Sequence, residues 1–337
     1  MLRLGTLHLR LSPRSVVMVA VPILALIVGC QAETTFTPVP DATNFPMLIA
    51  TRTEISTLAL SPTSTVTPTS TVTPTATFVP ALTDLQRQQL SVIQAVFPQY
   101  DGPQEVCEWD RISCDQQGYI TEIQAFQAGL TSLAPEIGQL TRLRKLNLSQ
   151  CHLKRLPPEI GELSNLEDLE IVANNLVDLP PEIGKLTRLS LLQVAGNHLT
   201  SLPSEITNLS SLVDLQVDSN QLASLPEQIG RLSRLKYLYL TANELTSLPP
   251  SIGNLSALEE LRMNHNHLTS IPAGVGNFSN LRLLFASDNR LTSIPPEIAR
   301  LSRLRYLILD GNPIEQISPE ICAKFEHVAI EPPTLCP

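Results

Sequence analysis

The chain has 337 residues, with 23 basic and 32 acidic side chains and a formal net charge of −9. An acidic balance disfavours nucleic acids and anionic membrane surfaces as partners. No phosphate-binding loop, G-x-S-x-G, H-E-x-x-H or C-x-x-C motif occurs, so we expect no enzyme, no cofactor and no metal site.

The first segment, residues 1–29, carries Arg3, Arg10 and Arg14 but no acid, followed by a run of apolar residues. This run is shorter than the roughly 20 residues of a membrane-spanning helix, which predicts a signal peptide. Its end, I-V-G-C, resembles the lipobox of bacterial lipoproteins. The resemblance implies cleavage before Cys30, lipidation of its thiol, and an extracytoplasmic protein lipid-anchored to the bacterial cell membrane or envelope. The alternative is an N-terminal anchor that is not cleaved.

Residues 30–82 are rich in Thr, Pro and Ser, and TSTVTP occurs twice in succession between Thr63 and Pro74. Such a segment has too few apolar residues to form a core and is expected to be disordered. Its reach would be roughly 40 Å as a coil and roughly 160 Å when extended. We expect a stalk that holds the next domain away from the membrane; a passive linker is the alternative.

A short helix is expected at the start of the N-terminal cap, residues 83–119. Thr83 or Asp84 would be its N-cap, and the helix would stop before Pro98. Its apolar side chains recur at helical spacing, which predicts that one face packs against the rest of the domain. They are Leu85, Leu90, Ile93 and Val96.

After this helix comes the motif C-x-W-x-x-x-x-C-D. It resembles the N-terminal cap of plant-type extracellular leucine-rich-repeat proteins. The resemblance implies a disulfide bond between Cys107 and Cys114, with Trp109 packed on the open end of the core.

A 23-residue pattern then recurs nine times without an insertion, over residues 120–326. Its third copy, residues 166–188, reads L-x-x-L-x-L-x-x-N-x-L-x-x-L-P-x-x-I-x-x-L-x-x. The first part alternates apolar and polar residues like a strand, and the second spaces Ile183 and Leu186 by three, which fits a helical or irregular return arm. One repeat buries too little apolar surface to fold alone, so the copies are expected to stack.

This pattern resembles the leucine-rich-repeat proteins, and its L-P-x-x-I-G-x-L half is similar to the Ras-group and plant-type subclass. The resemblance implies an α/β solenoid: a right-handed leucine-rich-repeat horseshoe with a parallel concave β-sheet and short helical or irregular convex arms. The ninth position is Ala128 and Cys151 in the first two copies and Asn in the others. Buried amides there would satisfy backbone groups of adjacent coils and form an asparagine ladder. Its members would be Asn174, Asn197, Asn220, Asn243, Asn266, Asn289 and Asn312.

The six cysteines favour an exported protein. Besides Cys30 and the cap pair, Cys322 and Cys336 form a C-terminal pair, and bridges at the two ends suit an oxidising compartment. Cys151 is left over, and we expect a buried, inert thiol. Residues 327–337 are expected to close the solenoid as a C-terminal cap.

The candidate ligand-binding surface lies on the predicted sheet. Positions 3 and 5 of each repeat share one face, on strands about 4.8 Å apart, and leucine-rich-repeat proteins usually bind there. Repeats six to nine gather four aromatics at these positions, although the chain is only 4% aromatic, and aromatics and Arg dominate binding hot spots. The predicted patch is Tyr237, Tyr239, Glu260, Arg262, Leu283, Phe285, Tyr306 and Ile308. The alternative is that these residues only complete an amphipathic strand surface.

Nearer the N-terminus the same face is charged and could orient a partner electrostatically. A solvated charged face is the equal alternative. The acidic residues are Glu167, Asp168, Glu170, Asp214 and Asp218, beside basic Arg144 and Lys145.

We expect a non-catalytic cell-surface binding module that recognises a protein or peptide partner on the concave face. The alternative is a structural or adhesive envelope lipoprotein that acts by self-association or wall contact. An enzyme would need a catalytic group made from residues such as Glu167, Asp168 and His265, which no spacing supports. His265 and His267 have no further ligand in the sequence and are interpreted as solvated surface.

For the location, the alternative is a eukaryotic secreted protein with sugar acceptors at N-x-S sites, and the lipobox argues against it. These sites are Asn147, Asn208, Asn254 and Asn277.

Overall fold

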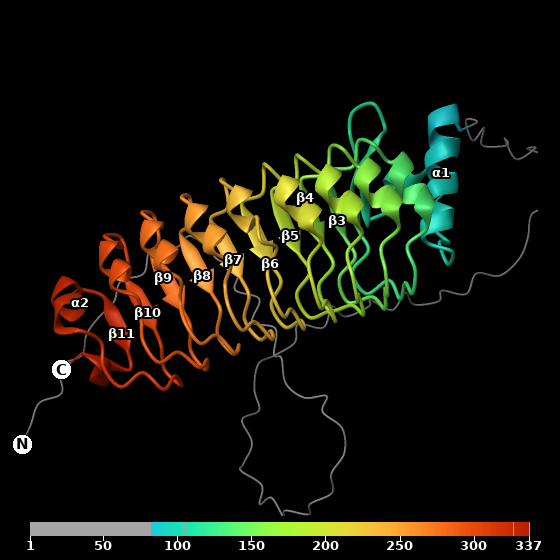
Figure 1. Ribbon diagram of the computed structural model, residues 1–337. Helices are drawn as coiled ribbons and strands as arrows, with labels where there is room; N and C mark the ends of the chain where they lie inside the picture. Colours follow the sequence, from blue (N-terminus) through green and yellow to red (C-terminus); the bar gives the residue numbers. More distant parts are fainter. Residues whose placement is uncertain (1–81, 104, 326, 337) are drawn as a thin grey trace, which may run out of the picture. The chain divides into compact units, whose positions relative to one another are not determined.

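The computed structural model describes residues 82–103, 105–325 and 327–336. The predicted signal peptide, the lipidation site at Cys30 and the stalk up to residue 81 lie outside them. The described part of the chain forms one sheet whose 11 strands follow in sequence order (Figure 1). Neighbouring strands are parallel except for β1 and β2. The strands are β1 (Ile112–Cys114), β2 (Ile120–Gln124), β3 (Lys145–Asn147), β4 (Asp168–Glu170), β5 (Leu191–Gln193), β6 (Asp214–Gln216), β7 (Tyr237–Tyr239), β8 (Glu260–Arg262), β9 (Leu283–Phe285), β10 (Tyr306–Ile308) and β11 (Ala329–Glu331).

Each 23-residue repeat forms one coil of the solenoid. Leu169 in β4 pairs with Leu192 in β5, and the strands from β2 to β11 all keep this register. Because side chains alternate across a strand, the middle residue points into the core and its two neighbours point outward. The predicted horseshoe of leucine-rich repeats with a parallel sheet is confirmed. All seven apolar positions of the third repeat are buried, namely Leu166, Leu169, Ile171, Leu176, Leu179, Ile183 and Leu186.

The return arms contain short 3-10 helices, which line the side of the stack opposite the strands (Figure 1). Pro158 and Pro181 begin their arms, where a missing N–H leaves no helical hydrogen bond unmade. The helices are η2 (Pro135–Gln139), η3 (Pro158–Glu162), η4 (Pro181–Lys185), η5 (Ser204–Asn208), η6 (Ile229–Arg231), η7 (Pro250–Asn254), η8 (Ala273–Asn277) and η9 (Pro296–Arg300).

Successive arms pack closely at the nineteenth repeat position. A Cβ added at Gly161 would lie 2.6 Å from the backbone oxygen of Glu182 and 2.8 Å from its Cβ. At the same position of the fourth repeat stands Thr207, which is buried, and the arm stacked on it, η6, has three residues instead of five. The short arm therefore follows the repeat in which threonine stands at this position.

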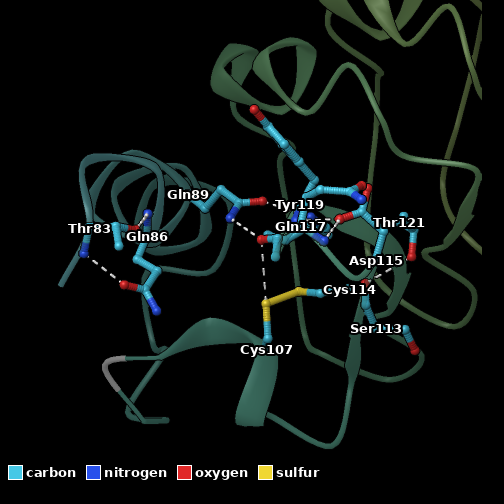
Figure 2. The surroundings of a disulfide bond; sticks show 12 residues. Thr83, Gln86, Gln89, Cys107, Ser113, Cys114, Asp115, Gln117, Tyr119 and Thr121 are labelled. Atoms are coloured by element: carbon cyan, nitrogen blue, oxygen red, sulfur yellow. Dashed lines mark hydrogen bonds between the residues drawn. A yellow bond between two sulfur atoms is a disulfide. The ribbon is translucent and has the colours of Figure 1, made fainter. Parts of the chain in front are cut away.

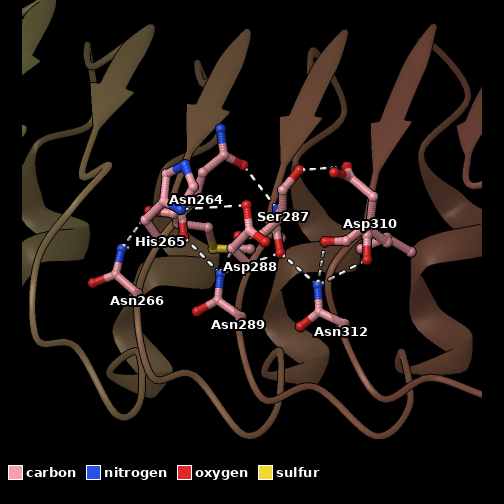
Figure 3. Close-up of polar contacts among 11 residues, drawn as sticks. Asn264, His265, Asn266, Ser287, Asp288, Asn289, Asp310 and Asn312 are labelled. Carbon is pink, nitrogen blue, oxygen red and sulfur yellow. Dashed lines mark hydrogen bonds and ion pairs between the residues drawn. The ribbon is translucent and has the colours of Figure 1, made fainter. Parts of the chain in front are cut away.

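The asparagine ladder is present. The Asn243 Oδ1 accepts a hydrogen bond from the Leu222 N–H at 3.0 Å, and its Nδ2 donates to the carbonyls of Val217 and Leu240, both at 3.0 Å. Figure 3 shows three later members, Asn266, Asn289 and Asn312. Asn243 thus joins two coils: its Oδ1 is the partner of a buried backbone N–H, and its Nδ2 shares the two carbonyls with the amides of Asn220 and Asn266.

Cys151 replaces the amide in the second coil. Its thiol is buried and free, as predicted, and lies 3.5 Å from the carbonyl oxygen of Ala125. A thiol is a weak donor, so this contact is a weaker version of the asparagine bond to the same place in the preceding coil.

The helix α1 (Asp84–Val96) begins where the sequence predicts. Thr83 and Gln86 form a capping box, in which each side chain accepts a hydrogen bond from the backbone N–H of the other residue. Gln89 has a role that periodicity does not reveal: it is buried, donates to the Gly118 carbonyl and accepts from the Ile120 N–H, each at 2.7 Å (Figure 2). It therefore fastens α1 to the first repeat.

The expected cap disulfide is formed between Cys107, in η1 (Val106–Glu108), and Cys114 in β1 (Figure 2). The Trp109 ring packs edge-on against Phe97 and Tyr100, with centroids 5.5 and 4.9 Å away, and lies against the core. The first coil is thereby covered.

The C-terminal end contains one more strand than the nine repeats predict. Ala329 in β11 pairs with Tyr306 in β10, again 23 residues apart. The helix α2 (Pro319–Lys324) takes the place of the last 3-10 arm, and the Cys322–Cys336 disulfide ties it to the tail. The tail thus extends the sheet before it closes the core. None of the described helices is long and apolar enough to cross a bilayer.

Candidate functional site

The eight residues of the predicted patch lie together on the outward face of β7 to β10. Register places Arg262 between Tyr239 and Phe285 on adjacent strands. The outer residues of these four strands come from positions 3 and 5, because position 4 is buried in the core. We call this surface the concave patch; it comprises Tyr237, Tyr239, Glu260, Arg262, Leu283, Phe285, Tyr306 and Ile308.

Arg262 organises the centre of the concave patch. Its guanidinium carbon lies 4.7 Å from the ring centroid of Tyr239 and 5.5 Å from that of Phe285. The Glu260 carboxylate forms an ion pair with the Arg262 guanidinium. Stacking between two rings restrains a long side chain that would otherwise lose conformational entropy on binding a partner.

Exposure differs across the patch. Tyr306 is 47% exposed and Glu260 only 8%. Glu260 is therefore placed to hold Arg262, while the aromatic and aliphatic side chains present most of the contact surface. Burial, and then the charge of Glu260, raises the pKa of the Tyr239 phenol, so Tyr239 is a neutral hydroxyl at physiological pH.

Part of the charged surface nearer the N-terminus neutralises itself. Glu167 accepts two hydrogen bonds of 2.9 and 3.0 Å at one carboxylate oxygen from Arg144, which also reaches the second oxygen at 2.9 Å. The Lys145 ammonium lies 3.8 Å from Asp168 and 3.9 Å from Glu122. These ion pairs join neighbouring coils and leave little net charge for a ligand.

Three other carboxylates on the same face, Glu170, Asp214 and Asp218, form no ion pair among the described residues; we call them the acidic stretch. Glu170 accepts from the Asn147 amide at 3.1 Å, and Asp218 from the Thr241 N–H at 2.8 Å. Asp214 accepts only from the Gln216 amide, at 3.1 Å, and its other carboxylate oxygen is buried without a partner. Sequence reasoning did not single out Gln216.

Burial raises the pKa of all three carboxyl groups in the acidic stretch, and that of Asp214 to about 6. The carboxylates of Asp218 and Glu260 add to the shift of Asp214. A carboxyl group whose pKa is higher in the folded than in the unfolded state holds its proton more tightly when the protein is folded. Its contribution to folding stability is therefore present at pH 4 and is lost as pH rises from about 4 to 6.

We therefore expect Asp214→Asn to stabilise the protein at pH 7.5 by about 1–2 kcal/mol, after allowance for solvent screening. The gain should shrink as pH falls to 4, where the native carboxyl is protonated. Urea unfolding of both proteins at pH 7.5 and 4 measures it, with the exposed Asp178→Asn as control. An equal difference at both pH values would contradict the expected ionisation cost.

The two histidines lie on the turn edge of the sheet. His265 has its backbone in the left-handed region, with φ 51°, and its Nδ1 lies 3.3 Å from Asp288, while the Nε2 of His267 lies 2.8 Å from Glu244 (Figure 3 shows the first pair). Each histidine thus faces one carboxylate on a neighbouring coil. Within residues 82–103, 105–325 and 327–336, no three His, Cys, Asp or Glu side chains are grouped to hold a metal ion.

The residues considered for catalysis are far apart. Glu167 and Asp168 belong to the third coil, whereas His265 follows β8 in the seventh. Four strand spacings, about 19 Å, separate them. The structure does not bring this group together.

Comparison with known proteins gives the family. The sequence matches the family described as leucine-rich repeat region over residues 131–225, 192–284 and 214–327. No curated protein matches the chain. The fold is similar to the leucine-rich-repeat ectodomain of the Arabidopsis thaliana membrane receptor kinase GASSHO1/SCHENGEN3, solved in complex with CASPARIAN STRIP INTEGRITY FACTOR 2. That structure is 28% identical, with a TM-score of 0.58, over 70% of this chain and 34% of the receptor chain.

The fold is also similar to the plant peptide hormone receptor RGFR1, solved in complex with RGF2. Identity is 26% and the TM-score 0.54, over 66% of this chain and 48% of the receptor chain. The present chain thus matches between a third and a half of each receptor chain. The repeats, their register and these matches agree, and the chain belongs to the leucine-rich-repeat family.

Proposed function

We propose that this protein is a non-catalytic binding module that recognises a protein or peptide partner on the concave face of its repeats. The observation that carries the proposal is the concave patch, where four aromatic side chains and a stacked Arg262 lie on four adjacent strands. Rigid aromatic and Arg side chains provide most of the binding energy at protein interfaces.

Two further observations support the proposal. Both similar plant structures were solved as complexes, one of them of a peptide hormone receptor. Disulfides at both ends of the solenoid fit an extracytoplasmic domain. A lipid anchor at Cys30, the Thr/Pro stalk and a plant-type N-terminal cap would together present the repeats at the cell surface.

The test uses the compact unit Thr75–Pro337, which contains the whole described core. Immobilised protein is exposed to fractionated envelope and secreted material, beside a variant with Tyr237→Ala, Tyr239→Ala and Phe285→Ala. We expect saturable binding that the variant loses by at least about 100-fold, since three hot-spot aromatics are removed.

The control is Phe126→Ala, which removes an aromatic that is 41% exposed outside the patch. It should bind like the parent, and all proteins should unfold at similar urea concentrations. Binding that is equal in the parent and the triple variant would reject the concave face as the site. Such a result, with wall retention or concentration-dependent oligomers, would favour a structural or adhesive envelope role.

A further inference from the structure

We propose, building on the function above, that the partner is an extended peptide segment with a cationic end and an apolar end. The cation lies over the acidic stretch of Glu170, Asp214 and Asp218, and the apolar residues lie over Leu283, Phe285, Tyr306 and Ile308. The juxtaposition of these two surfaces along one sheet face carries the inference.

The charged side chains without an ion-pair partner on the sheet face indicate which part of the face attracts a cation. Arg144, Lys145, Lys236 and Arg262 each have an acidic partner within 4 Å on the same face. The acidic stretch has no basic partner within that distance among the described residues; Lys145 and Arg262 act on Glu170 and Asp218 only from farther away, and offset part of the rise that burial causes in the pKa of each. The carboxylates of the acidic stretch are part-buried, so they have lost some of their water, and their interaction with an incoming cation is stronger than that of fully exposed groups.

Asp214 is the centre of the acidic subsite that would bind the cation of the peptide. Its Oδ1 is buried without a hydrogen-bond partner among the described residues and its Oδ2 accepts only from the neutral Gln216 amide, so no cation compensates the charge; its register neighbour on β7 is Tyr237. A carboxylate beside an aromatic ring suits a Lys or Arg side chain, which can contact both groups. Asp218 already accepts the Thr241 N–H, so its contribution is the more structural of the two.

On β9 and β10 the face carries apolar groups beside two basic side chains, and the exposed Glu331 follows on β11 next to Ile308. Arg282 and Arg305 immediately precede β9 and β10, are exposed, and form no ion pair among the described residues. Beside them lie the apolar members of the concave patch, including Tyr306 at 47% exposure. A peptide whose apolar residues lie over β9 and β10 thus has its cation directed away from Arg282 and Arg305.

The sheet also fixes the spacing. Asp214 on β6 and Leu283 on β9 are three strand intervals apart, about 14 Å for strands at 4.8 Å. A peptide that crosses the strands in extended form covers about 3.3 Å per residue, so its cation and its first apolar anchor are about four positions apart, with about three residues between them.

Defined peptides test this inference on the unit Thr75–Pro337. The probes are fluorescein-labelled Lys-Lys-Gly-Ser-Gly-Phe-Leu and its reverse order, compared with a version in which Glu replaces both Lys residues. Fluorescence anisotropy should show that at least one Lys peptide binds about tenfold or more tightly than its Glu counterpart. Equal affinity for the Glu peptide, or no saturable binding of either Lys peptide, overturns the proposal.

Two pairs of charge-removing variants test whether the acidic stretch binds the Lys side chains of the peptide. Glu170→Gln with Asp214→Asn should weaken the Lys peptide about tenfold, whereas Glu162→Gln with Asp178→Asn removes the same charge from exposed positions off the patch and should change affinity less than twofold. If Glu170→Gln with Asp214→Asn leaves the affinity unchanged, the acidic subsite does not bind the cation and this part of the proposal is overturned. If the capture experiment succeeds while the peptides fail, the concave-face function stands and only the stated partner chemistry is wrong.

Discussion

Asn243→Ala is expected to lower the free energy of unfolding by about 2–4 kcal/mol. The residue is 4% exposed, and its amide is the hydrogen-bond partner of the Leu222 N–H and of the Val217 and Leu240 carbonyls. Alanine leaves the buried Leu222 N–H without its partner, whereas the Val217 and Leu240 carbonyls still accept from the Asn220 and Asn266 amides. An unsatisfied buried N–H costs about 1–3 kcal/mol, and each of the two lost amide bonds costs about 0.5–1.5 kcal/mol.

The effect should also be local in its first stage, because each coil contacts only its neighbours. Hydrogen exchange is expected to accelerate in the fifth to seventh coils before the terminal coils respond. Urea unfolding of Thr75–Pro337 gives the total change. The control is Asn254→Ala, an exposed Asn at the end of η7, for which we expect less than about 1 kcal/mol. A loss below 1 kcal/mol for Asn243→Ala would mean that water replaces the amide and that the ladder adds little stability.

Most of the fold follows from the sequence because every repeat satisfies the same conditions. Leu169, for example, is apolar, buried and paired in register with Leu192. Nine consecutive copies without an insertion leave one arrangement that buries all of them, a stack of coils. The asparagine ladder is predictable for the same reason, since only a buried amide supplies both a donor and acceptors at that turn.

What the repeat pattern does not predict lies at the ends and between coils. Gln89 reads as a polar helix residue, and its burial depends on the Gly118 and Ile120 backbone groups 29 and 31 residues away. β11 was missed because His327 stands where a repeat begins with an apolar residue. Its signal was Ile330, 23 residues after the buried Leu307, with which it pairs.

The candidate site was predictable in position more than in chemistry. Strand alternation places Tyr239, Arg262 and Phe285 on one outward face, and register makes them adjacent. Single-strand patterns, however, give no sign that Glu260 is buried beside its ion-pair partner Arg262, or that Asp214 has no basic partner in the described part of the chain. Those properties arise from contacts between coils.

Gly161→Ala is expected to destabilise the protein by about 2–3 kcal/mol or more, although alanine is the better helix former. The new methyl group would overlap the Glu182 backbone oxygen, 2.6 Å away, and this oxygen belongs to the neighbouring arm η4 and cannot rotate aside like a side chain. Relief requires the two coils to separate, which weakens their contacts along the whole repeat.

In the fourth repeat the same position is Thr207, and the next arm, η6, has three residues instead of five. We therefore expect Gly161→Ala to disrupt η4 while the sheet remains paired, a result that urea unfolding and hydrogen exchange at η4 together detect. The control is Glu162→Ala, which changes an exposed residue of η3, the arm that also contains Gly161. Glu162 forms an ion pair with Lys185 on the surface, and its loss should lower the free energy of unfolding by less than about 1 kcal/mol. Unfolding free energies that are equal for the two variants would show that the arms have free space between them and that helix propensity, rather than coil spacing, decides the residue at this position.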